Sequence, residues 1–300
     1  MTERAEADRI QVLRPCPALF EFNCMMLRTT DKRVQEVIRN QRAVMDENRA
    51  MARRMQTPHL PLHEILPDGA WSGEPCFVVA GGPSLRGFDF ERLRGRGRVI
   101  AINRAFEFIP WADMLFFMDH TFYQFVHKDP ERLAKWESFR GYRVFLNMMG
   151  RLVPDCNSVK AIGRSGVSHS HSKGLYHGNN SGFGALQMAL ALGCRPIYLL
   201  GYDMLDEGKA NKTDAQTHWH SGYGRLAHMG APLSFRRDFD LEANRLKKLD
   251  YVFNLNPRSG LRVFKFKTIE EVLNGPARES VGNDTMPSAV PDVLGSFAQD

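Results

Sequence analysis

Residues 76–85 read Cys-Phe-Val-Val-Ala-Gly-Gly-Pro-Ser-Leu, an apolar run that ends in a glycine turn. Four more short apolar runs, rich in β-branched or aromatic residues, lie at 99–102, 114–118, 144–146 and 197–200. Runs of this length without polar alternation are typical of parallel strands that are covered on both faces. Helix-length segments separate them, at 129–136, 181–192 and 240–249. We therefore predict an α/β fold with a Rossmann-like, doubly wound and mostly parallel sheet.

The flanks of this core have a different composition. Residues 31–56 contain neither Gly nor Pro and repeat apolar residues at helical spacing, whereas residues 57–75 are rich in Pro and Gly. Past Asn274 the chain loses its periodicity and again carries several Pro and Gly residues. We predict an N-terminal helical extension and linker over 1–73, a Rossmann-like nucleotide-binding catalytic domain over 74–274 and a C-terminal tail over 275–300.

The face of the predicted N-terminal helix that lies opposite its apolar residues is basic. Its arginines are Arg39, Arg42, Arg49, Arg53 and Arg54. Two interpretations stay open: the helix packs on the core or on a second copy of the chain, as in a homo-oligomer, with a solvated basic face, or it is an arm that contacts an anionic partner such as DNA.

The overall charge is mildly positive. The 300 residues include 40 Lys and Arg against 34 Asp and Glu, a net charge of +6. Such an excess favours phosphate-bearing ligands without demanding them, so nucleotides, nucleic acids and acidic sugars all remain candidate partners.

The sequence does not indicate a membrane protein or a secreted one. The mean hydropathy is −0.36, and no apolar run approaches the roughly 20 residues that cross a bilayer. Residues 1–13 are charged and contain no apolar segment of the secretory type, so we expect a cytoplasmic protein. The five cysteines are scattered without a Cys-x-x-Cys pair, which favours reduced and mostly buried thiols.

In open α/β sheets, ligands bind beyond the carboxyl ends of the strands. The residues that follow the predicted strands are therefore the candidates: the turn Gly81, Gly82, Pro83 and Ser84, then Asn103, Asp119 and Asp203. In the turn, two glycines permit unusual dihedral angles and close approach to a ligand, and the amides after Pro83 attract anions. The turn matches neither a P-loop nor a Gly-x-Gly-x-x-Gly fingerprint, but its position after a buried strand favours a nucleotide cradle over a purely structural turn.

A second turn precedes the Ala-rich segment near residue 185. Here Asn180 or Ser181 either caps the following helix or, with Gly182, holds a ribose or phosphate.

The histidines concentrate at His169-x-His171 and His218-Trp219-His220, with His228 nearby. No spacing typical of zinc sites supports a metal, so we expect none. We predict that His220 or His218 is a general base, with the alternative that these residues merely line a polar loop. Asp119 and Asp203 either bind a divalent ion, accept hydrogen bonds from hydroxyl groups or cap the next turn, and the residues alone do not rank these roles.

Together these motifs resemble the MptE-like superfamily (the DUF115 group), which includes the bacterial sialyltransferases of glycosyltransferase family forty-two. Phe77 to Leu85 looks like the Gly-x-Gly-Pro-Ser-Leu opening of that group, and Asn103 matches its second-strand Asn. The later matches are Asn180-Ser181-Gly182, Ile197 to Asp203, His218-Trp219-His220-Ser221 and Asn256 to Leu261. The resemblance covers Glu74 to Leu273.

The two branches of this superfamily imply different reactions. The resemblance to the sialyltransferases implies sugar transfer from a cytidine nucleotide to a hydroxyl, with inversion, no required metal and His220 as base. The resemblance to the MptE branch implies magnesium-dependent transfer of diphosphate from ATP to a hydroxymethylpterin, with Asp119 and Asp203 placing the ion. A shared crevice does not decide between them.

We predict a nucleotide-dependent transferase, most simply a glycosyltransferase that takes a sugar from a nucleotide-sugar (CMP-linked by the resemblance) to a hydroxyl of a small molecule, a glycan or a modified DNA base. The alternatives are the magnesium-dependent diphosphokinase and a non-catalytic nucleotide- or nucleic-acid-binding module. The catalytic candidates are His220, His218 and Asp203, and the candidates for steadying the departing phosphate are Tyr223, Arg236 and Arg237. The nucleotide-binding candidates are Gly81, Gly82, Pro83, Ser84, Asn103, Asp119, Asn180, Ser181 and Gly182.

Overall fold

The computed structural model describes residues 35–36, 39–40, 61–151, 153–204, 218–220 and 232–274. The chain divides into two compact units, residues 1–59 with 149–154 and residues 60–148 with 155–300, and the elements below belong to the second. Residues 35–36 and 39–40 are helical. The rest of the helix predicted over 31–56, and the tail predicted over 275–300, lie outside the described residues. The domain boundaries and the role of the basic helix therefore stay predictions.

In the described residues, nine strands form one sheet of order β6-β5-β4-β3-β2-β1-β7-β8-β9, and every neighbouring pair is parallel. The five predicted strands are β1 (Cys76–Val79), β2 (Arg98–Ile102), β3 (Met114–Phe117), β4 (Tyr142–Asn147) and β7 (Ile197–Leu200). Four strands were not predicted: β5 (Asn157–Gly163), β6 (Leu175–Tyr176), β8 (Val252–Asn254) and β9 (Lys265–Phe266). These strands lie toward the two ends of the sheet order, and they are either very short or partly exposed.

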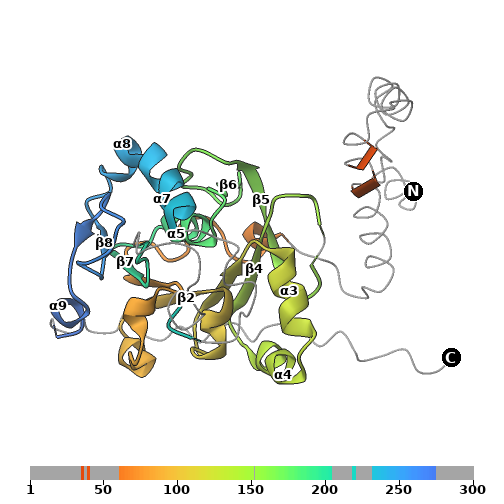
Figure 1. The fold of residues 1–300 in the computed structure, drawn as a ribbon, viewed down its shortest axis with the longest axis horizontal. Coiled ribbons are helices and arrows are strands. Elements are labelled where there is room, and N and C mark those ends of the chain that lie inside the picture. Colours follow the sequence, from red (N-terminus) through yellow and green to blue (C-terminus); the bar gives the residue numbers. More distant parts are fainter. Residues whose placement is uncertain are drawn as a thin grey trace, which may run out of the picture. The chain divides into compact units, whose positions relative to one another are not determined.

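The connections make the sheet doubly wound, as predicted. From β1 the chain runs outward to β6 and then returns to β7, which pairs with β1 on its other side. The outward half is connected by η3 (Pro83–Leu85), η4 (Phe90–Leu93), η5 (Asn103–Glu107), α3 (His120–His127) and α4 (Pro130–Ser138). The return half contains α5 (Ser181–Ala191), α7 (Pro232–Leu241), α8 (Ala243–Leu246) and α9 (Ile269–Leu273). The short helix η2 (Leu62–Glu64) precedes β1. Figure 1 shows α5, α7 and α8 on one side of the strands and α3 and α4 on the other.

Helix α5 is the central element of one layer, and all of its residues are buried. Apart from Ser181 and Gln187 it is made of apolar residues and glycines on every side, as expected for a helix enclosed between two layers. Phe116 and Leu146 of the sheet lie against Gly184, and the ring of Phe183 contacts Phe239 of α7 at 5.0 Å. Burying one such large apolar side chain stabilises the fold by about 1.5–3 kcal/mol.

The opposite layer is an aromatic cluster. Phe117 of β3 points away from α5, and its ring lies 5.3 Å from Phe122 of α3 and 5.8 Å from Trp136 of α4. Phe106 of η5 joins them, 6.0 Å from Trp136. Because adjacent strand residues point to opposite faces, the predicted strands are apolar throughout, without alternation.

The described part of the predicted linker packs on the core. Leu62, Leu66 and Trp71 are buried there, and the amides of Gly69 and Trp71 donate to the carbonyls of Ala191 and Leu192 at 2.8 Å. This segment therefore closes the carboxyl end of α5.

Two general expectations can be compared with the described residues. Among their helices, none combines the length and the apolar composition that crossing a bilayer requires. Cys76, Cys156 and Cys194 are buried and free, as predicted for these thiols; Cys16 and Cys24 lie outside the described residues.

We predict that Gln187→Leu lowers the free energy of unfolding by about 2–5 kcal/mol, because buried donors and an acceptor lose their partners. The Gln187 side chain of α5 accepts from the amides of Ser168 and Tyr176, at 2.9 and 3.2 Å, and donates to the Tyr176 carbonyl at 2.8 Å. Urea unfolding measures the change. Gln124→Leu, on the exposed face of α3, is the control and should stay within about 0.5 kcal/mol. Equal effects of the two substitutions would contradict the prediction.

Candidate active site

The chain reverses its direction of winding between β1 and β7, and this is where open α/β sheets bind ligands. Val79 pairs with Ala101 of β2 and with Leu200 of β7. Gly81, Asn103 and Tyr202, each two residues further on, therefore follow their strands at the same level of the carboxyl edge. The predicted candidates from these three strands thus come together at one crevice.

The glycine turn has ordinary dihedral angles. Gly82 has φ −63° and ψ 143°, and neither Gly81 nor Gly82 is among the residues with positive φ, so the unusual angles that we predicted are not found. Space is the reason for glycine instead. A Cβ on Gly82 would lie 2.3 Å from the Gly201 carbonyl oxygen and 2.7 Å from Asp203 Cγ, and a Cβ on Gly81 would lie 2.8 Å from His218 Cδ2.

Asp203 fixes the shape of this turn. Its side chain is buried, with 4% of the residue exposed. Its carboxylate accepts from the Ser84 amide at 2.7 Å, the Ser84 hydroxyl at 2.5 Å and the Asn256 side-chain amide at 2.8 Å. The Ser84 amide, one of the amides after Pro83 that we expected to attract an anion, and the Ser84 hydroxyl are therefore both engaged by Asp203. In this structure Asp203 connects the turn after β1 to the loop after β8 by hydrogen bonds. Its catalytic role stays a prediction.

Residues after β8 support the same loop from its other side. The Ser259 hydroxyl donates to the Tyr202 carbonyl at 2.6 Å, and the Gly260 amide donates to the Asp203 carbonyl at 2.6 Å. Sequence reasoning gave Asn256 and Ser259 no role, although they follow a strand as the other candidates do. Recognising Val252–Asn254 as a strand is the signal that would have found them.

Trp219 connects the segment His218-Trp219-His220 to the glycine turn by two hydrogen bonds. Its amide donates to the Gly81 carbonyl at 3.1 Å and its indole N–H donates to the Ala80 carbonyl at 2.9 Å. His218 and His220 flank it, with ring centres 5.4 Å apart, and the Nε2 atoms of both rings lie within 3.7 Å of where a Gly81 Cβ would be. Both imidazoles therefore face the glycine turn, as a pair of candidate bases should.

Asn103 combines strain with an unsatisfied group. Its φ is +50°, in the left-handed region, and its Oδ1 is buried with no hydrogen-bond partner among the residues that the structure describes. Backbone strain of this kind costs about 1–3 kcal/mol, and an unpaired buried acceptor costs about 1–3 kcal/mol more. A side chain held at this cost on the edge of the crevice is well placed to bind a ligand.

Asp119 lies apart from Asp203. It is exposed, although desolvation by the surrounding protein raises the pKa of its carboxyl above the ordinary value. Strands β3 and β7 are three positions apart in the sheet, about 14 Å at the usual strand spacing. The two carboxylates therefore do not face one another, and within the described residues no three His, Cys, Asp or Glu side chains form a group that suits a metal ion.

In the turn before α5, some polar groups are bonded to other described residues and one hydroxyl is not. Asn180 caps the helix, as one of our two interpretations predicted, because its Oδ1 accepts from the Gly182 amide at 2.7 Å. The Tyr202 hydroxyl donates to the Gly182 carbonyl at 2.9 Å, which links this turn to the end of β7. The Ser181 hydroxyl has no partner within the described part of the chain and remains available to a ligand.

The remaining candidates are less well placed. Arg236 and Arg237 lie on α7, which reaches the α5 turn through a bond from the Asn180 side chain to the Phe235 carbonyl; Arg236 pairs with Asp240 at 3.3 Å. Tyr223 and His228 lie outside the described residues. His171 is away from the crevice, buried against Asp68 at 3.3 Å.

Comparison with known proteins gives one distant match. No family model matches the chain, and no curated protein matches it. Among solved structures, the chain is similar to the MAf glycosyltransferase from Magnetospirillum magneticum AMB-1, with 17% identity and a TM-score of 0.47 over 75% of this chain. The matched region spans 38% of that protein.

We predict that Gly82→Ala is more destabilising than Gly81→Ala. The Cβ on Gly82 meets a backbone carbonyl that cannot move, whereas the Cβ on Gly81 meets the movable His218 ring. We expect a loss of about 1–3 kcal/mol or more for Gly82→Ala and less than about 1 kcal/mol for Gly81→Ala, with the histidines of the latter displaced. Urea unfolding and the NMR shifts of the His218 and His220 ring protons measure the two effects. Equal losses of stability with unchanged histidine shifts would contradict this account of the turn.

Proposed function

We propose that the protein is a nucleotide-dependent glycosyltransferase that moves a sugar from a nucleotide-sugar donor to an acceptor hydroxyl, with His220 as general base. The observation that carries the proposal is the position of the His220 imidazole. It faces the Gly81 turn at the reversal point of a parallel sheet, where such sheets bind nucleotides. An imidazole is suited to accept a hydroxyl proton near neutral pH.

The donor would lie along the carboxyl edge of β1, β2 and β7. The Asn103 side chain, whose Oδ1 has no hydrogen-bond partner among the described residues, and the Ser181 hydroxyl would bind its ribose and phosphate. Ser84 would act through Asp203 by holding the turn. The other proposed contacts are Gly81, Gly82, Pro83, Asp119, Asn180 and Gly182. A cytidine nucleotide is the donor type suggested by the sequence resemblance.

The proposed reaction is a single displacement. The acceptor oxygen forms a bond to the anomeric carbon while the bond from that carbon to the leaving phosphate oxygen breaks, and the electron pair leaves with the nucleotide. His220 takes the hydroxyl proton, and His218, 5.4 Å away between ring centres, lies beside it. Tyr223, Arg236 and Arg237 are the candidates for stabilising the charge on the leaving phosphate.

The diphosphokinase alternative has less support. It requires a magnesium ion between the two predicted carboxylates, but Asp203 is turned to Ser84 and Asn256 and lies three strands from Asp119. Transfer to a DNA base and binding through the basic helix concern a segment outside the described residues, so both remain predictions.

Turnover with a defined donor panel tests the proposal. We expect the full-length protein to release nucleotide from at least one of CMP-, UDP- or GDP-linked sugars with EDTA present, and not from ATP with magnesium. His220→Ala should lower kcat by about 10²–10⁴ without weakening donor binding, because general base catalysis contributes that much. His169→Ala is the control. His169 is exposed and belongs to the His169-x-His171 pair, which lies away from the site, so this variant should have the kcat of the wild type.

Other outcomes would reject the proposal. Turnover only with ATP and magnesium would identify the diphosphokinase. Absence of turnover with every donor, together with salt-sensitive DNA binding that is lost on removing residues 1–60, would identify the binding module.

We predict that Asn103→Gly weakens binding of the donor nucleotide at least tenfold while the free energy of unfolding is unchanged or rises by about 1 kcal/mol, because left-handed strain is relieved. Calorimetric titration with CMP, or with the nucleotide of the active donor, and urea unfolding measure the two effects. Asp155→Gly is the matched control: Asp155 also has positive φ, +56°, but precedes β5 at the opposite edge of the sheet. Its nucleotide binding should not change. Loss of stability without loss of binding in Asn103→Gly would contradict the assignment.

A further inference from the structure

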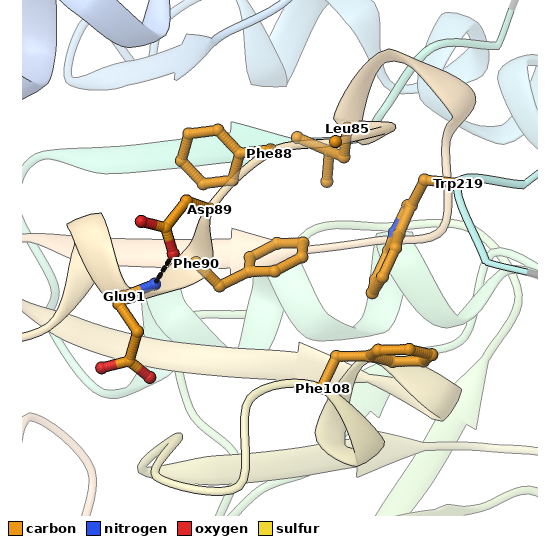
Figure 2. Close-up of a pocket in the computed structure, with 8 residues that line it drawn as sticks. Leu85, Phe88, Asp89, Phe90, Glu91, Phe108 and Trp219 are labelled. Carbon is orange, nitrogen blue, oxygen red and sulfur yellow. Dashed lines mark hydrogen bonds between the residues drawn. The ribbon is translucent and has the colours of Figure 1, made fainter.

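An aromatic hollow of about 300 Å³ lies beside the candidate base. Figure 2 shows Phe90 and Phe108 pointing toward Trp219, with Asp89 and Glu91 at the end away from it. Leu85, Gly87 and Phe88 complete the lining. The volume is at the small end of the range for ligand sites, which suits a single ring.

Two residues that line the hollow, Phe108 and Trp219, also contact the His220 ring. The Phe108 ring stacks on the His220 imidazole, with ring centres 5.9 Å apart and planes at 15°. Trp219 contacts Phe108 at 4.8 Å and His220 at 4.9 Å. A group bound against Phe108 and Trp219 is therefore next to the imidazole that would take its proton. Phe108 remains 44% exposed although it belongs to this aromatic group, so a face of it is open to a ligand.

The charges in the lining are negative. Asp89 and Glu91 are the charged residues that line the hollow. The Asp89 carboxylate accepts one bond from the Glu91 amide, at 3.0 Å, and Glu91 binds Arg94 and the Trp111 indole. Because a carboxylate repels a phosphate but accepts hydrogen bonds from hydroxyl groups, this end disfavours the donor nucleotide and favours a neutral hydroxylated group.

We propose that the hollow binds one uncharged sugar ring of the acceptor, an assignment that rests on the proposed glycosyltransferase function. The C–H face of the ring packs on the faces of Phe108 and Trp219, whose π-electrons attract weakly positive hydrogens. Its hydroxyl groups point toward Asp89, and the hydroxyl that reacts lies at the Trp219 end, near His220.

Ligand binding to the full-length protein tests the proposal directly. The probes are the methyl glycosides of glucose, galactose, mannose and N-acetylglucosamine, observed by saturation-transfer NMR. We expect at least one to bind, with the strongest transfer to protons of one ring face. Phe108→Ala and Phe108→Leu should each weaken binding about tenfold, because both remove the aromatic face. Ile65→Ala, which truncates a side chain of the same 44% exposure outside the hollow, should not.

The sign of the charge gives a second, independent readout. We expect wild-type protein to bind the neutral glycoside at least tenfold more tightly than methyl glucuronide, whose carboxylate meets Asp89. Asp89→Asn keeps a residue that caps η4 and should bring the two affinities within about threefold.

The outcomes separate this proposal from the proposed function. The protein could bind nucleotide and turn over a donor, yet bind no neutral glycoside or bind one equally well in both Phe108 variants. Either result would overturn the hollow as an acceptor site and leave the proposed glycosyltransferase function standing. Tighter binding of glucuronide or of tetramethylammonium than of any neutral glycoside would also overturn it. If the protein binds a glycoside in a way that requires Phe108 but binds no nucleotide, the hollow is supported as a sugar-binding site and the proposed glycosyltransferase function is rejected.

Discussion

The hydrogen bonds of Asp203 are the constraint on which the site depends. One buried carboxylate joins three segments that are distant in sequence: the turn after β1 through Ser84, the end of β7 on which it lies, and the loop after β8 through Asn256. With these bonds made, Gly82 is held so close to Gly201 that no Cβ fits. The Ala80 and Gly81 carbonyls are then in place to accept from Trp219, and Trp219 in turn positions both histidines. A buried carboxylate is stable only when its oxygens are hydrogen-bonded in this way, so we expect the Asp203 hydrogen bonds and the site to form together on folding.

The crevice also separates groups that stabilise the fold from groups that are available to a ligand. Asp203, Asn180 and Tyr202 have their polar atoms engaged within the protein. Asn103 instead combines a strained backbone with a buried oxygen that has no hydrogen-bond partner in the described part of the chain, a combination often found at functional sites. The aromatic hollow adds an exposed Phe108 beside His220. The proposed ligand-binding surface therefore includes both the strained Asn103 and the exposed Phe108.

The buried runs that begin at Cys76, Val99 and Ile197 were predictable because strands covered by helices on both faces need apolar residues at every position. The same reasoning fails for β5, where Lys160 and Ile162 are exposed, and for β6, β8 and β9, whose two or three residues carry no measurable period. Because β8 was missed, Asn256 and Ser259 were identified only through the family resemblance and received no role in the site. The glycine turn was recognised, but the predicted unusual dihedral angles were wrong, and the clash of a Gly82 Cβ with residue 201 was not foreseen because it cannot be read from neighbours in the sequence.

The sequence by itself determined the class of the fold and the edge of the sheet at which chemistry should occur, since apolar runs define the strands and the residues that follow them must share that edge. Only the tertiary structure decided which of those residues face each other. It turned Asp203 toward Ser84 and away from Asp119, placed His218 and His220 over Gly81, and stacked Phe108 on the candidate base. These are contacts between residues more than a hundred positions apart, or between side chains whose directions depend on packing. Local patterns record neither, because they specify which face a residue occupies and not which distant residue it meets.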